Sequence, residues 1–142
     1  MLEVILIANA IWFGMAFEAF YLRRKIFAKV MVPIREDRDN TAYGAVVESG
    51  KFLGGFNLAS SLLNVGLVFN IAGFDRPEQW VLLLAFNSIA HGSQFWGNVP
   101  IALQNRKGGG IWNVFKGVML RIFVIDFVLM VANAVMAILI IA

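Results

Sequence analysis

Long apolar runs separated by short polar segments dominate the pattern of the chain. Residues 2–22 are almost continuously apolar, and further apolar stretches occupy about 52–72, 80–103 and 117–141. A helix of about 20 apolar residues is long enough to cross the hydrocarbon core of a bilayer. The pattern therefore predicts an all-α fold, a bundle of four transmembrane helices that forms a single membrane domain over residues 1–142.

Composition supports a membrane location. Hydrophobic residues make up 60% of the 142 residues and charged residues only 15%, and the mean hydropathy is +0.76. Soluble domains are roughly 45–50% apolar, and a small soluble domain could not bury so much apolar surface. We therefore expect an integral, multi-pass membrane protein whose first partner is the lipid bilayer.

Basic residues predict the orientation of the spans. Six of the twelve Lys and Arg residues lie between Arg23 and Arg38, directly after the first apolar run, whereas the turn 73–79 carries only Arg76. Basic segments stay on the cytoplasmic side of a membrane. We expect a basic cytoplasmic loop over 23–41, both termini on the outer side, and an inner or cytoplasmic-type membrane. A basic cluster beside a span indicates topology and attraction to anionic lipid rather than nucleic-acid binding.

The segments between the spans carry more local predictions. Pro33 and the mixed charges of 35–40 favour a turn or loop. We expect residues 25–32 to form a short amphipathic helix on the membrane surface. The glycines of 104–110 favour a flexible inner loop, and 111–116, with a tryptophan, favour a short interfacial helix.

Small and polar residues recur on one face of the second span. Gly50, Gly54, Asn57, Ser61 and Asn64 are separated by four, three, four and three positions. Small residues let helix backbones approach closely, and Asn or Ser can form hydrogen bonds across the contact. This face is predicted to pack against another helix.

The third span carries a polar stripe. Asn87, His91, Gln94 and Asn98 follow one another at i, i+4, i+7 and i+11, and His91 is the only histidine of the chain. Residues with this spacing share one helix face. Hydrogen-bonding groups at bilayer depth must face protein or water, so the stripe predicts a polar seam inside the bundle.

Further ionisable residues lie at a similar depth in the other spans. Asp126 is roughly 8 Å deeper than Arg121 along a helix, and Glu18 is near the inner end of the first span. Charges at this depth need partners. We expect Glu18 to pair with Arg121 or Lys51, and Asp126 to orient or charge His91.

Two interpretations of these polar groups stay open. One is a cytoplasm-facing ligand pocket or proton path, with His91 and Asp126 as candidate catalytic groups. The other is a set of bonds that fixes the register of the helices. The predicted pocket residues are Glu18, Asn87, His91, Gln94, Asn98, Arg121 and Asp126.

Residue counts exclude several kinds of chemistry. The chain has no cysteine, so disulfides, thiolate nucleophiles and iron–sulfur clusters are excluded. One histidine cannot supply a di-iron site that needs two. No protein-bound metal is predicted, and no cofactor is identified. His91 is flanked by the small residues Ala90 and Gly92, so axial ligation of haem or chlorophyll is one hypothesis, beside the commoner role as a hydrogen-bonding partner.

Two short motifs carry a family resemblance. Residues 30–33 read Val-Met-Val-Pro after the first span, and 98–105 read Asn-Val-Pro-Ile-Ala-Leu-Gln-Asn at the end of the third, followed by Trp112. In these segments and in its four-span layout the chain resembles the small membrane proteins related to anthrone oxygenases. Arg121 and Asp126 depart from the pattern of that family.

The resemblance implies a bundle that binds a hydrophobic or aromatic small molecule and oxidises it with molecular oxygen without a cofactor. His91 would then be the base that deprotonates an acidic carbon, and Asn98 or Gln94 would hold the oxyanion. The alternative is a non-catalytic accessory subunit of a larger membrane complex, in contact with pigment or haem through His91. In both cases we expect a homo-oligomer or other membrane subunits as protein partners.

Overall fold

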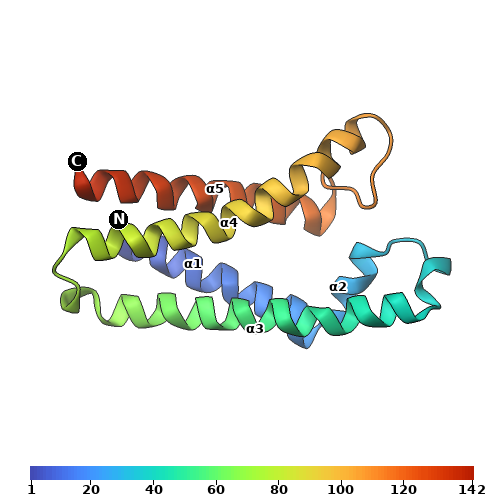
Figure 1. Cartoon of the computed structure of the whole chain (residues 1–142), viewed down its shortest axis with the longest axis horizontal. Helices are drawn as coiled ribbons and strands as arrows, with labels where there is room; N and C mark the ends of the chain where they lie inside the picture. The colour runs from blue at the N-terminus through green and yellow to red at the C-terminus, as the bar shows by residue number, and fades with distance from the viewer. The chain divides into compact units, whose positions relative to one another are not determined.

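A computed structural model describes all of residues 1–142, and its regular structure is entirely helical, without a strand (Figure 1). The long helices are α1 (Leu2–Phe17), α3 (Thr41–Phe69), α4 (Pro77–Arg106) and α5 (Gly117–Ile141). The shorter elements are a π-helical turn η1 (Glu18–Leu22), α2 (Arg24–Met31), and the 3-10 turns η2 (Glu36–Arg38) and η3 (Ile71–Gly73).

Three segments are long and apolar enough to cross a membrane: Leu2–Leu22, Thr41–Phe69 and Gly117–Ile141. They are consistent with a lipid-embedded, multi-pass protein. The predicted third span falls in α4, which has 30 residues but carries the polar stripe and is not among these three helices.

The chain divides into two compact units. The α1–α3 unit is Ile7–Leu67, and the α4–α5 unit combines Met1–Leu6 with Val68–Ala142.

Within the α1–α3 unit, two glycines of α3 touch the segment that follows α1. A Cβ atom on Gly50 would lie 2.6 Å from the carbonyl oxygen of Phe20, and one on Gly54 would lie 2.6 Å from the Cβ of Tyr21. Both partners belong to η1, where the helix widens. Only glycine fits these two positions, because any side chain would collide with the neighbouring segment.

Hydrogen bonds extend the same contact towards the start of α1. Ser61 Oγ donates to the carbonyl of Ala10 at 2.8 Å, and Asn9 Nδ2 donates to Asn64 Oδ1 at 3.4 Å. Asn57, the remaining member of the predicted packing face, is half-buried and donates only to the carbonyl of Leu53 on its own helix. The structure thus brings four of the five predicted residues into the contact.

The short helix α2 spans Arg24–Met31, close to the range 25–32 that the sequence predicts. A loop follows it, and Asn40 then begins α3 by accepting a 2.8 Å hydrogen bond from the backbone nitrogen of Tyr43. This side-chain cap satisfies one of the free N–H groups at the start of the helix.

Arg38 closes the end of α2. Its guanidinium donates to the carbonyls of Val32 at 2.7 Å, Pro33 at 2.8 Å and Lys29 at 3.1 Å. The last carbonyls of a helix have no partner within the helix. Arg38 supplies donors to this region, so the loop is tied to the helix that precedes it.

The α4–α5 unit is built on two long helices that lie side by side (Figure 1). Pro77 stands in the first turn of α4, where its missing N–H costs nothing. Trp80 Nε1 donates to the carbonyl of Phe74 at 3.1 Å, which joins the preceding turn to the helix. Further along, Ser88 Oγ donates to the carbonyl of Met130 at 2.9 Å and links α4 to α5.

The expected helix over 111–116 is absent, and α5 begins only at Gly117. The side chain of Asn105 explains the difference. Its amide nitrogen donates to the carbonyls of Gly109 at 2.8 Å and Trp112 at 2.9 Å, and its oxygen accepts from the backbone nitrogen of Val114 at 2.7 Å. These bonds hold 107–116 as a compact loop and use backbone groups that a helix would have paired internally.

Candidate functional site

A histidine–aspartate pair joins the middle of α4 to α5. His91 Nδ1 lies 3.0 Å from Asp126 Oδ1, and their side chains are 1% and 3% exposed. The contact expected from the sequence between these two residues is therefore present. Both groups sit on regular helix, so packed backbone holds their separation.

The chemistry of the pair follows from its donors and acceptors. An ionised carboxylate only accepts hydrogen bonds, so Nδ1 carries the proton when Asp126 is charged. In a neutral ring the other nitrogen, Nε2, is then the basic one. When the ring gains a proton, the adjacent carboxylate stabilises the positive charge. The arrangement can act as a proton acceptor whose orientation is set by Asp126.

Two contacts to one methionine fix α4 against α5 next to the pair. Ser88 bonds to the backbone of Met130. A Cβ on Gly92 would lie 3.2 Å from the Met130 sulfur. The Met130 side chain therefore packs directly against Gly92, the small residue beside His91.

Aromatic rings follow the pair along both helices. Phe95 on α4 stacks on Phe123 of α5 with centroids 4.7 Å apart, and it lies 5.0 Å from Phe127. Phe95 is one helical turn beyond His91, and the two α5 rings lie on either side of Asp126 in the sequence. The polar pair is thus bordered by an aromatic cluster of Phe95, Phe123 and Phe127.

The predicted polar stripe is only partly continuous. Asn87, His91 and Asn98 are buried, but Gln94 is exposed. Asn98 Nδ2 donates to the carbonyl of Gln94 at 2.9 Å, and its oxygen accepts from Trp112 Nε1 at 3.1 Å. Asn98 therefore anchors the 107–116 loop to α4.

The expected pairing of Glu18 with Lys51 is wrong. Its carboxylate pairs with Arg23 at 2.7 Å, and Lys51 pairs with Glu48 instead. The π-helical turn explains the choice, because the backbone bond from Arg23 to Glu18 spans five residues and stacks their side chains. Arg121 is exposed near the start of α5 and forms no ion pair within the α4–α5 unit.

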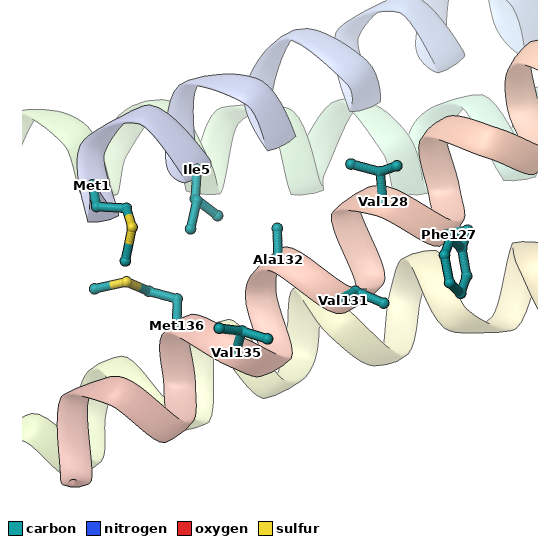
Figure 2. A pocket seen from close by; sticks show the side chains of 8 residues that line it. All are labelled: Met1, Ile5, Phe127, Val128, Val131, Ala132, Val135 and Met136. Atoms are coloured by element: carbon teal, nitrogen blue, oxygen red, sulfur yellow. The ribbon is translucent and has the colours of Figure 1, made fainter.

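An apolar pocket of about 380 Å³ lies on α5 within the α4–α5 unit. Figure 2 shows Met1 and Ile5 on one side and α5 residues from Phe127 to Met136 on the other. None of the residues predicted to form a ligand pocket lines it. Phe127 connects the two features, because it borders this pocket and also contacts Phe95.

Sequence reasoning missed several residues of this region. Ser88 and Asn105 were not singled out, although both make bonds that position α4. The aromatic cluster could have been found, since Phe123 and Phe127 are four residues apart and share a helix face. No sequence pattern pointed to Ser88 or Asn105. Their partners are backbone carbonyls and amides, which every residue has, so the partner residues have no recognisable type. No known protein family, characterised protein or solved structure matches the chain.

Proposed function

We propose that this chain is a four-span membrane protein that binds a hydrophobic aromatic molecule near the aromatic cluster and uses His91 as a proton acceptor. The observation that carries the proposal is the buried 3.0 Å contact between His91 and Asp126. Ionisable residues inside membrane helices are costly and are characteristic of functional sites.

The membrane arrangement is part of the proposal. α4 has enough residues to cross a bilayer, and its stripe residues Asn87, His91 and Asn98 are buried away from lipid. With α4 as the third of four spans, the basic segment after α1 and the loop 107–116 lie on the cytoplasmic side. Both termini then lie on the outer side of an inner or cytoplasmic-type membrane.

The proposed chemistry is proton transfer. A ligand that displaces the neighbours of the buried His91 ring gives up a proton from an acidic C–H or O–H group to the ring, and Asp126 stabilises the resulting imidazolium. A positioned general base contributes roughly 10²–10⁴-fold to a rate. The aromatic cluster supplies ring faces for an aromatic ligand, because aromatic pairs favour stacked and edge-to-face contacts.

The resemblance to anthrone-oxygenase relatives suggests that this proton transfer is the first step of an oxidation. Removal of one proton from a ring CH₂ leaves a carbanion, which gives electrons to O₂ and forms a C–O bond. The resulting peroxide anion takes up a proton to become a hydroperoxide, which then loses water. The CH₂ group thus becomes C=O, one oxygen atom stays in the product, and the other leaves as water.

A second candidate function is that of an accessory subunit without catalysis. The observation in its favour is that every buried side-chain nitrogen and oxygen has a hydrogen-bond partner. In this hypothesis the His91–Asp126 contact and the Ser88 bond set the register of α4 against α5. The exposed apolar faces then contact lipid and other membrane subunits or further copies of this chain.

Binding of anthrone to the detergent-purified chain separates the two functions. Added anthrone is expected to quench the tryptophan fluorescence of the wild-type protein. The wild-type protein is also expected to consume O₂ when anthrone is present. His91→Gln is expected to keep binding and lose O₂ consumption, while Ser93→Ala, whose exposed hydroxyl bonds only to Ala90 of its own helix, behaves as wild type. Absence of both signals in wild type, with His91→Gln lowering only thermal stability, would favour the accessory subunit.

A further inference from the structure

The short helix α2 has two different sides. Its inner side is packed: Ala28 is fully buried, and a Cβ on Gly50 of α3 would lie 3.2 Å from the Arg24 Cβ. Its outer side exposes Lys25, Ile26 and Lys29, and the Ile26 side chain is 60% exposed. The outer side therefore presents two ammonium groups together with an exposed apolar side chain.

The basic residues around α2 differ in what they already bind. Arg23 pairs with Glu18 at 2.7 Å, and Arg24 pairs with Glu48 at 3.4 Å. The guanidinium of Arg38 is used by backbone carbonyls. Lys25 and Lys29 have no acidic partner. The arginines are thus engaged within the fold, and the two lysines present their charges outward.

The position of α2 along the chain indicates what faces these lysines. The apolar segment Leu2–Leu22 ends immediately before the helix. Leu22 is 62% exposed and leads directly into the outer side of α2. Lys25 and Lys29 are one turn apart and share a face with Ile26. A helix with lysines and bare apolar residues together at the end of a span matches the headgroup region of a bilayer.

We propose that the outer side of α2 binds the headgroups of anionic phospholipids, with Lys25 and Lys29 contacting the lipid phosphate and Ile26 and Leu22 contacting the acyl region. Charge complementarity selects an anionic headgroup, and the exposed apolar residues select a lipid rather than a free anion. Each lysine near an anionic surface contributes about a fivefold gain in affinity.

The test uses the full chain in a neutral detergent, with native mass spectrometry after addition of equal amounts of phosphatidylglycerol and phosphatidylcholine. Wild type is expected to retain phosphatidylglycerol preferentially. In the double variant Lys25→Gln/Lys29→Gln this preference is expected to fall about 25-fold, and Lys25→Arg/Lys29→Arg is expected to keep it. Lys107→Gln/Lys116→Gln is the matched control, because it removes two exposed lysines elsewhere.

Several outcomes would overturn the proposal. Equal retention of both lipids by wild type is one, and an equal loss in the control double variant is another. Displacement of phosphatidylglycerol by inorganic phosphate alone would show a free-anion site, and displacement by an acidic peptide would show a protein-binding surface. Thermal unfolding of each variant checks that the exposed substitutions leave the fold intact.

Discussion

His91 Nδ1 on α4 and Asp126 Oδ1 on α5 lie 3.0 Å apart, with both side chains almost completely buried. The same two helices are joined by the Ser88 hydroxyl and the Met130 carbonyl. One helix contact therefore carries both the proposed chemistry and a large part of the packing. Experiments at this contact need readouts that separate activity from stability.

The first prediction concerns Asp126. Asp126→Ala leaves a buried ring nitrogen without its partner, and we expect a loss of about 1–3 kcal/mol in the free energy of unfolding. Asp126→Asn keeps the volume and an acceptor oxygen, so its loss should be smaller. Denaturation in mixed detergent micelles measures both, with Ser93→Ala as control. Equal stability of Asp126→Ala and the control would contradict the role of the pair in packing.

The second prediction concerns the close contact between η1 and α3. Gly54→Ala places a methyl group 2.6 Å from the Tyr21 Cβ, and Gly50→Ala places one 2.6 Å from the Phe20 carbonyl oxygen. Overpacking of this kind costs about 1–3 kcal/mol. We expect both variants to unfold at lower temperature than wild type.

Gly55→Ala is the matched control for these glycines. It lies on the same helix, and its added Cβ would have no neighbour within 4 Å. We expect it to be neutral or slightly stabilising, because alanine favours helix over glycine. If all three alanine variants behave alike, the loss arises from something other than the contact with η1.

The third prediction concerns the loop 107–116. Asn105→Ala removes hydrogen bonds to Gly109, Trp112 and Val114. We expect faster hydrogen exchange in this loop, with little change in the middle of α4, because local opening follows the loss of local bonds. Gln104→Ala is the control, since Gln104 stands next to Asn105 but its side chain is exposed and makes none of these bonds. Unchanged exchange in Asn105→Ala would show that the loop is held by other contacts.

The fourth prediction concerns the end of α2. Arg38→Ala removes donors from the carbonyls of Lys29, Val32 and Pro33. We expect fraying of the last turn, seen as faster hydrogen exchange and earlier proteolytic cleavage near Met31. Arg35→Ala, an exposed arginine of the same loop, should leave cleavage unchanged. The same cleavage pattern in both variants would contradict a capping role for Arg38.

Much of the local architecture follows from residue patterns. Apolar runs predicted the segments Leu2–Leu22 and Gly117–Ile141 closely, because length and hydropathy are local properties of the chain. The spacing of Gly50, Gly54, Ser61 and Asn64 predicted a packing face, because the helical period sets which residues share a side. The sequence also predicted that His91 and Asp126 would meet, since two ionisable groups buried at similar depth need each other.

Tertiary structure decided which partner each remaining polar side chain takes. Glu18 bonds to Arg23 rather than Lys51 because a π-helical turn stacks the nearer pair. Asn98 accepts a hydrogen bond from the Trp112 side chain. The hydrogen bonds of Asn105 hold a loop where the sequence predicts a helix. Hydrogen bonds require separations near 3 Å, and such separations depend on the rotation and register of whole helices. The sequence by itself thus determined the long helices and the packing face of α3, and only the packed helices selected the hydrogen-bond partners of the polar side chains and the loop at 107–116.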